Sequence, residues 1–323
     1  MAYRLRLDEP VGRGIRRIAL EQIEIAEGKL ASRSDVSAAI HDTRRSLKRL
    51  RALLRLAQPG FDEALFRAET ERLVAIGKLL SGARDLDVIS QTLARLEPQL
   101  NATRPGMAGR LQAVVGHRLN ADRRKRRDHR RLALERLGQT KKFFSGKAPL
   151  SIELDHLIEG LGRSYRKARQ AFRNAYAEPG DEPFHALRKR VQLHWRHMAL
   201  LSRAWPDVLS ARAAEAKELS RLLGEDHDYS ILVGLAKELG DSVLEPEDAE
   251  TLAVLCASCQ TDLRAAARPR LERLLTESAG NLKQRVECYW VSAQHLAVLP
   301  PAEERVAAQQ ASTSAIKRAH RRR

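Results

Sequence analysis

Residues 41–55 read HDTRRSLKRLRALLR, and the periodicity of this segment indicates the class of fold. On a helical wheel the leucines of this stretch gather on one side, and the basic residues fill an arc of roughly 120° on the other. That arc consists of His41, Arg44, Arg45, Lys48, Arg51 and Arg55. The pattern predicts an amphipathic helix that packs its leucines into a core and presents a cationic stripe.

A second copy of the stripe begins 144 residues later, at His185. Both copies have the spacing His-x-x-Arg-(Arg/Lys)-x-(Leu/Val), and the second arc consists of His185, Arg188, Lys189, Gln192 and Arg196. Residues 80–89 match residues 223–232 in the same way, at an offset of 143 residues. Two nearly equal offsets indicate a tandem duplication, with repeat 1 at about 5–145 and repeat 2 at about 150–300.

A weaker match aligns residues 12–17 with residues 162–167, so each half is expected to open with a basic helix. The cations of these two segments are Arg13, Arg16, Arg17, Arg163, Arg166 and Lys167.

The composition favours helices along the whole chain. Of 323 residues, 43% are hydrophobic but only 4% are aromatic, and Gly (18) and Pro (12) are scarce. A 3.6-residue period predicts helices at about 10–32, 36–57, 61–81, 84–97, 107–138, 152–177, 182–204, 208–223, 227–240, 247–276 and 281–297. We therefore expect an all-α protein made of two pseudo-symmetric helical bundles, with a basic groove or channel between them.

The net charge of +17 points to a polyanionic partner. Residues 1–150 hold 32 Lys and Arg against 17 Asp and Glu, whereas residues 151–323 hold 26 against 24. Both halves nevertheless carry the stripe. The first residues lack the apolar segment of a secretory signal, and no apolar run approaches the roughly 18 residues of a membrane span. These features predict a cytoplasmic protein that makes no membrane contact.

Phosphate suits the stripes chemically. Arg outnumbers Lys by 45 to 13, and its planar guanidinium binds oxygen atoms bidentately while staying charged. A histidine beside a polyanion is expected to favour its protonated form, which makes His41 and His185 candidate pH-sensitive ligands. The alternative is that each histidine only orients its neighbours. In the dense basic segment 118–142, spacing makes Arg126 and Arg130 further candidates, with the other cations solvated.

Carboxylates near Gly82 and Gly224 raise a catalytic hypothesis, because Asp85, Asp87, Asp226 and Asp228 suit Mg²⁺ bound to a phosphorylated substrate. Helix caps and pairs with Arg of a neighbouring helix are favoured instead, since both groups follow a helix-breaking glycine. Cys256 and Cys259 lack the second pair of ligands that a zinc site needs, and are expected to be small buried thiols. The sequence predicts no catalytic residue, metal site or cofactor.

The duplicated signatures resemble those of the conserved histidine α-helical domain (CHAD) family, over roughly residues 5–300. The resemblance implies a domain at residues 1–302, a basic tail at 303–323, and a basic central surface that binds inorganic polyphosphate, often in proteins associated with polyphosphate granules. Carried over by position, the ligands are His41, Arg44, Arg45, Lys48, His185, Arg188 and Lys189, flanked by the cations of the two opening helices. The second half departs from the family at Gln192 and Trp195, so weaker binding is expected there.

Three functions stay open at this point. The leading hypothesis is a non-catalytic protein that binds inorganic polyphosphate at granules. The second is a nucleic-acid-binding, nucleoid-associated protein, which the net charge supports but the scarcity of aromatic residues does not. The third is a metal-dependent phosphohydrolase that uses the four aspartates.

Overall fold

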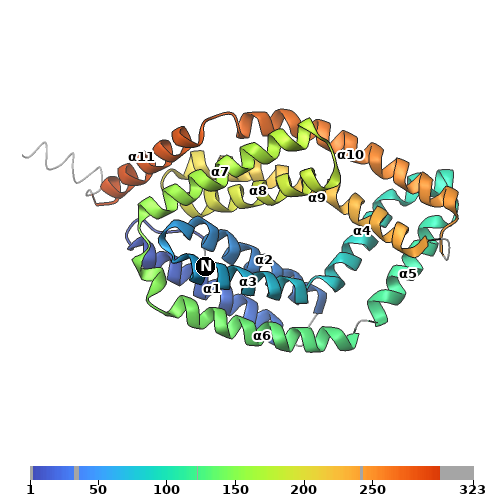
Figure 1. Ribbon diagram of the computed structural model, residues 1–323, viewed down its shortest axis with the longest axis horizontal. Helices are drawn as coiled ribbons and strands as arrows, with labels where there is room; N and C mark the ends of the chain where they lie inside the picture. The colour runs from blue at the N-terminus through green and yellow to red at the C-terminus, as the bar shows by residue number, and fades with distance from the viewer. Residues whose placement is uncertain (1–2, 33–35, 122, 241–242, 299–323) are drawn as a thin grey trace, which may run out of the picture.

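A computed structural model of the chain describes residues 3–32, 36–121, 123–240 and 243–298 (Figure 1). These residues form α-helices joined by short turns, and no strand occurs among them. The all-α prediction is confirmed. The helices are α1 (Val11–Ala31), α2 (Val36–Leu56), α3 (Glu63–Leu79), α4 (Gly82–Thr103), α5 (Met107–Ala121), α6 (Arg123–Ser145), α7 (Leu154–Ala177), α8 (Asp181–Leu201), α9 (Pro206–Leu239), α10 (Pro246–Leu274) and α11 (Ala279–Val298), with short 3₁₀ helices at Gln58–Gly60 and Ala148–Ser151.

Turn chemistry ends the helices where the sequence predicted breaks. Asp62 caps α3, since its side chain accepts hydrogen bonds from the backbone N–H groups of Ala64 and Leu65. Gly106 has a φ of 81° in the turn between α4 and α5, a conformation that suits glycine. Pro206 and Pro246 stand in the first turns of α9 and α10, where the missing N–H costs nothing.

Two predicted boundaries are wrong. The segment predicted as one helix at 107–138 forms two helices, α5 and α6. The predicted break at Gly224 is absent, because α9 runs without interruption from Pro206 to Leu239. Gly224 lies beside Arg188 of α8, whose Nη2 would be in ordinary van der Waals contact, at 3.5 Å, with a Cβ atom at this position.

Both hydrophobic cores draw on both halves of the chain. The larger core joins α1, α2, α3 and α6 to α7, α8, α11 and the adjoining parts of α9 and α10. The smaller core joins α4 and α5 to the last turns of α9 and the first turns of α10, at one end of the molecule (Figure 1). The two halves are therefore joined through shared cores, and their pseudo-symmetry stays a prediction. The tandem duplication stays a prediction.

The two halves approach each other closely where α7 meets the end of α2. Gly160 is buried in α7, and a Cβ atom at this position would come within 1.9 Å of the carbonyl oxygen of Leu56. Only glycine allows the two backbones to approach so closely. This contact holds the end of the first cationic stripe against α7.

The first prediction concerns this contact. Gly160→Ala should lower the free energy of unfolding by about 1–3 kcal/mol, because the added methyl overpacks the junction and forces α7 away from α2. Urea denaturation followed by circular dichroism measures the change. The matched control is Gly28→Ala in α1, where no atom lies within 4 Å of the added methyl. The control should gain up to about 1 kcal/mol from helix propensity. Equal effects in the two variants would contradict the account.

Candidate functional site

The first cationic stripe follows α2 from His41 to Arg55. His41, Arg45 and Arg51 are exposed, whereas Arg44, Lys48 and Arg55 are partly buried. Arg44 also stabilises the fold, because its Nη1 donates hydrogen bonds to the carbonyl oxygens of Gly77 (3.0 Å) and Leu80 (3.2 Å), where α3 ends. A cation at this position complements the negative end of the α3 dipole.

The two stripe-bearing helices contact each other at a buried histidine. Nε2 of His197 in α8 lies 3.0 Å from the carbonyl oxygen of Ala52 in α2. Burial, together with the nearby Arg196 and Arg55, lowers the pKa of His197 to about 4. Its ring is therefore neutral near pH 7, and the contact places cations of α2 beside those of α8.

A cation cluster occupies the junction of α2, α7 and α8. We call it the three-helix cation cluster, and it consists of Arg51, Arg55, Arg163, Lys167 and Arg190. Neighbouring groups that displace water from Lys167 lower its pKa although the side chain remains exposed, and the charges of Arg190, Arg55 and Arg163 lower it further. Burial, Arg190 and Arg51 lower the pKa of Arg55 in the same way. No carboxylate contributes to either shift, so these cations oppose one another.

Arg190 is the member of this cluster that the sequence did not predict. It lies two residues beyond Arg188, outside the arc defined by the stripe spacing. Its proximity to Arg55 and Lys167 comes from the packing of three helices, which no local pattern in α8 reveals.

Arg196 does not lie on the surface, although its place on the α8 arc predicted a ligand. Its side chain is only 6% exposed. It donates a hydrogen bond to the carbonyl oxygen of Gln192 (2.7 Å), and its guanidinium lies 4.2 Å from the ring centre of Trp195. Burial lowers the pKa of Arg196 to about 10. The N-terminal segment, through Tyr3, lies against this end of α8, so the ligand prediction for Arg196 is wrong.

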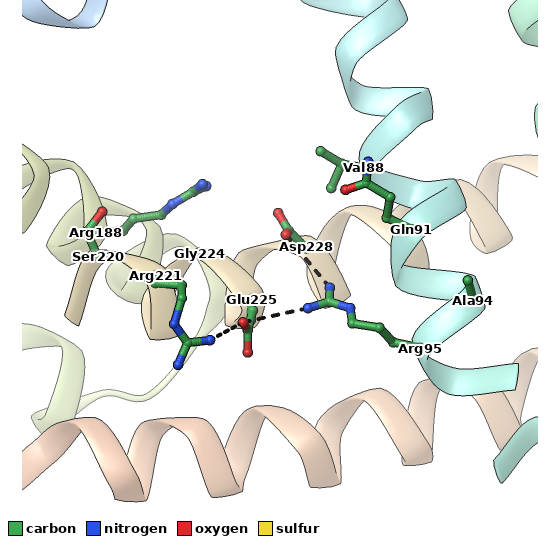
Figure 2. A pocket seen from close by; sticks show the side chains of 10 residues that line it. All are labelled: Val88, Gln91, Ala94, Arg95, Arg188, Ser220, Arg221, Gly224, Glu225 and Asp228. Carbon is green, nitrogen blue, oxygen red and sulfur yellow. Dashed lines mark hydrogen bonds and ion pairs between the residues drawn. The ribbon is translucent and has the colours of Figure 1, made fainter. Parts of the chain in front are cut away.

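Arg188 lines a cavity of about 480 Å³ between α4, α8 and α9 (Figure 2). The figure shows Arg95 reaching from α4 toward Glu225 and Asp228 of α9, with Arg188 on the opposite side. The lining residues are Val88, Gln91, Ala94, Arg95, Arg188, Ser220, Arg221, Gly224, Glu225 and Asp228. The volume falls within the range of small-ligand sites, about 300–1,000 Å³.

His185 stacks on His227 of α9, with their ring centres 3.9 Å apart. Burial, Lys189 and Arg188 lower the pKa of His185. Burial, His185 and Arg188 are the main causes that lower the pKa of His227 to about 3. Both rings are thus held in the neutral form near pH 7, which opposes the protonation expected for His185. His227 was missed as its partner, although its alignment with Arg84 placed it in the repeated signature.

The flanking cations divide into internal and outward groups. Arg17 forms ion pairs with Glu9 (2.5 Å) and Glu21 (3.3 Å), and it donates to the carbonyl oxygen of Arg4. Arg130 donates to the carbonyl oxygens of Leu30 and Ser32, where α1 ends. These contacts engage both guanidinium groups within the protein, and the ligand predictions for Arg17 and Arg130 stay predictions. The exposed candidates are Arg13, Arg163, Arg166, Lys167 and Lys189, while Arg16 is partly buried.

Arg126 lies in α6, but its side chain falls outside the described residues, and so does that of Asp85. Ligand predictions for the stripe residues His41, Arg44, Arg45, Lys48, Arg51, His185, Arg188 and Lys189 and for the remaining flanking cations stay predictions.

The aspartates make structural contacts. Asp226 is buried and pairs with Nε of Arg264 from α10 at 2.5 Å, as the inter-helix alternative predicted. It is not a helix cap, since α9 continues past it. Oδ2 of Asp87 accepts a hydrogen bond from Ser37 (2.7 Å). Within the described ranges, no three His, Cys, Asp or Glu side chains are grouped to hold a metal ion.

Cys256 is buried in α10, where burial raises its thiol pKa to about 12, and Cys259 is half-buried. No helix in the described part of the chain is both long and apolar enough to cross a membrane.

A family model for the CHAD domain matches residues 15–237 of this chain. The chain belongs to the CHAD-domain family. The match covers well over half of the sequence and includes both cationic stripes and the helices that carry the three-helix cation cluster.

Solved structures share the fold of this CHAD protein. A crystal structure of the CHAD domain from the plant Ricinus communis is 21% identical, with a TM-score of 0.60, and the similarity covers 84% of this chain and 95% of that one. PptA from Streptomyces chartreusis is 18% identical, with a TM-score of 0.56 and coverage of 83% and 100%. A search of curated proteins gave no match.

The second prediction concerns the stacked histidines. Arg188→Gln should raise the pKa values of both His185 and His227, because it removes a cation that opposes their protonation. An NMR titration of the imidazole Cε1 protons measures both values. The matched control is Arg190→Gln, which removes a cation of the same helix that influences neither ring. Unchanged pKa values in Arg188→Gln would contradict the described geometry.

Proposed function

We propose that this CHAD protein binds inorganic polyphosphate without catalysing a reaction on it, and that binding brings the protein to polyphosphate granules. The observation that carries the proposal is the three-helix cation cluster, in which neighbouring cations lower the pKa of Arg55 and of Lys167 and no carboxylate contributes to either shift. Within it, Arg163 pairs with Glu159 at 3.0 Å. Membership of a family associated with polyphosphate supports the same ligand.

Electrostatics favours a polyvalent anion at this cluster. Two like charges 4 Å apart repel by about 1 kcal/mol in water and by about 4 kcal/mol in surroundings of intermediate polarity. One bound anion with a single charge relieves only part of this repulsion in a group of five cations. A phosphate chain carries a negative charge on every unit, so one ligand can neutralise cations from α2, α7 and α8 together. Arginine forks add bidentate hydrogen bonds to its oxygen atoms.

The aromatic rings near the cluster favour polyphosphate over single-stranded nucleic acid. Proteins that bind single strands offer exposed rings on which bases stack. Here the guanidinium of Arg55 lies 4.9 Å from the ring centre of Phe66, which is buried, and Trp195 packs on Arg196. These rings position arginines instead of presenting a free face. A ligand made of phosphate alone matches such a surface.

The third prediction tests this surface. The double variant Arg55→Gln/Arg190→Gln should bind long-chain polyphosphate about 10- to 100-fold more weakly, because two charge-assisted contacts are lost. The slope of log affinity against log salt should fall by about 0.7–0.9 for each lost contact, if nucleic-acid behaviour transfers. Isothermal titration calorimetry at several salt concentrations measures both.

The matched control is Arg67→Gln/Arg173→Gln, which removes two cations exposed on α3 and α7 that interact with Glu63 and Gln170. It changes the net charge equally, so it should lose much less affinity. Equal losses in the two variants would assign binding to the overall charge instead of the cluster. Displacement of polyphosphate by duplex DNA at equal phosphate concentration would favour a nucleic-acid-binding protein. Release of phosphate from polyphosphate in the presence of Mg²⁺ would contradict the non-catalytic role.

A further inference from the structure

The cavity beside Arg188 differs from the three-helix cation cluster, because it contains carboxylates as well as cations. Its walls carry Arg95 from α4, Arg188 from α8, and Arg221, Glu225 and Asp228 from α9 (Figure 2). A site built only to attract a polyanion would gain nothing from two negative charges. Their presence inside the lining therefore requires a physical reason.

The carboxylates hold Arg95 loosely. Nη1 of Arg95 lies 3.8 Å from Glu225, and its Nη2 lies 3.9 Å from Asp228, so both ion pairs are longer than hydrogen bonds. The Arg95 side chain remains 40% exposed. Ion pairs of this kind contribute little to stability, so a ligand that offers Arg95 a closer anion can replace them.

Arg221 is held more firmly than Arg95. Its Nε lies 2.9 Å and 3.1 Å from the two carboxylate oxygens of Glu218, and it also pairs with Glu225. Together, Glu218 and Glu225 raise the pKa of Arg221. Glu225 therefore pairs closely with Arg221 and at a longer distance with Arg95. Arg95 also donates a hydrogen bond from Nη2 to the hydroxyl oxygen of Thr92 (3.1 Å). Because that partner is neutral, an anionic ligand can recruit Arg95 at less cost than Arg221.

We propose that this cavity is a second phosphate subsite, in which Glu225 and Asp228 pair with Arg95 until a phosphate chain replaces them as its partner. The inference rests on the proposed polyphosphate function and adds a determinant of selectivity to it. A ligand must supply enough charge to Arg95 and Arg188 together to overcome repulsion from the two carboxylates. A single phosphate lacks the length to do so, whereas a chain of linked phosphates contacts both arginines at once. The carboxylates therefore select chains over free phosphate.

The helix that carries Arg188 links the two sites. α8 contributes Arg188 to the cavity and Arg190 to the three-helix cation cluster. These two residues face nearly opposite sides of α8, so only a chain long enough to pass around the helix can reach both sites. Once a chain is bound at the cluster, its binding in the cavity is an intramolecular step. The high effective concentration in such a step favours long chains.

The fourth prediction tests the carboxylates. The double variant Glu225→Gln/Asp228→Asn should bind tripolyphosphate and long-chain polyphosphate about three- to tenfold more tightly than the wild type, since two repulsive charges are gone and Arg95 is already released. The gain should be larger for tripolyphosphate than for the long chain, because selection by length is weakened. Calorimetry at fixed ionic strength measures both affinities, and thermal unfolding verifies that the variant is folded.

The matched control is Glu215→Gln/Glu238→Gln, which removes two charges from the same helix outside the cavity, where they pair with Arg270 and Arg118. An equal gain in this control would overturn the inference, since net charge alone would explain it. Adding Arg95→Gln to the tighter-binding variant should abolish the gain. No gain in Glu225→Gln/Asp228→Asn, with normal binding by the wild type, would overturn the inference while leaving the proposed function intact. Absence of binding by the wild type would overturn both.

Discussion

The structure depends on the close packing of α2 against α7 and α8, three helices that all carry cations at their junction. Gly160 lets α7 approach the carbonyl oxygen of Leu56, and the buried contact of His197 with Ala52 joins α8 to α2. Apolar burial in the larger core opposes the repulsion between Arg55, Lys167 and their neighbours. Packing of the three helices therefore holds together positive charges that would move apart if the helices were separate.

This constraint distinguishes two kinds of cationic site in the protein. At the junction, cations face one another, and a polyanion is the partner that best relieves their repulsion. In the cavity, carboxylates of α9 already balance Arg95 and Arg221. In our proposal the first site attracts any chain of phosphates, and the second discriminates among ligands. Both halves of the chain contribute to each site, since Arg55 and Arg190 meet at the junction and Arg95 and Arg188 line the cavity.

Sequence patterns predicted the features that depend on local periodicity. The all-α class and the two stripes follow from spacings within single helices, such as His41 to Arg55. Features that depend on distant packing were missed. Arg190 joins the cluster only because α2 and α7 approach it, and the cavity exists only because α4 packs beside α9. Arg196 fits the stripe by spacing, yet the N-terminal segment buries it, so no pattern within α8 could exclude it.

The most direct measurement is a crystal structure of this protein bound to a short polyphosphate of defined length. The account predicts a continuous phosphate chain at the junction of α2, α7 and α8, with oxygen atoms within hydrogen-bonding distance of Arg55 and Arg190. It also predicts that Arg188 and Arg95 contact phosphate when the chain is long enough to enter the cavity. Phosphate bound elsewhere, for instance along the outer face of α6, with the junction unoccupied, would contradict the central claim.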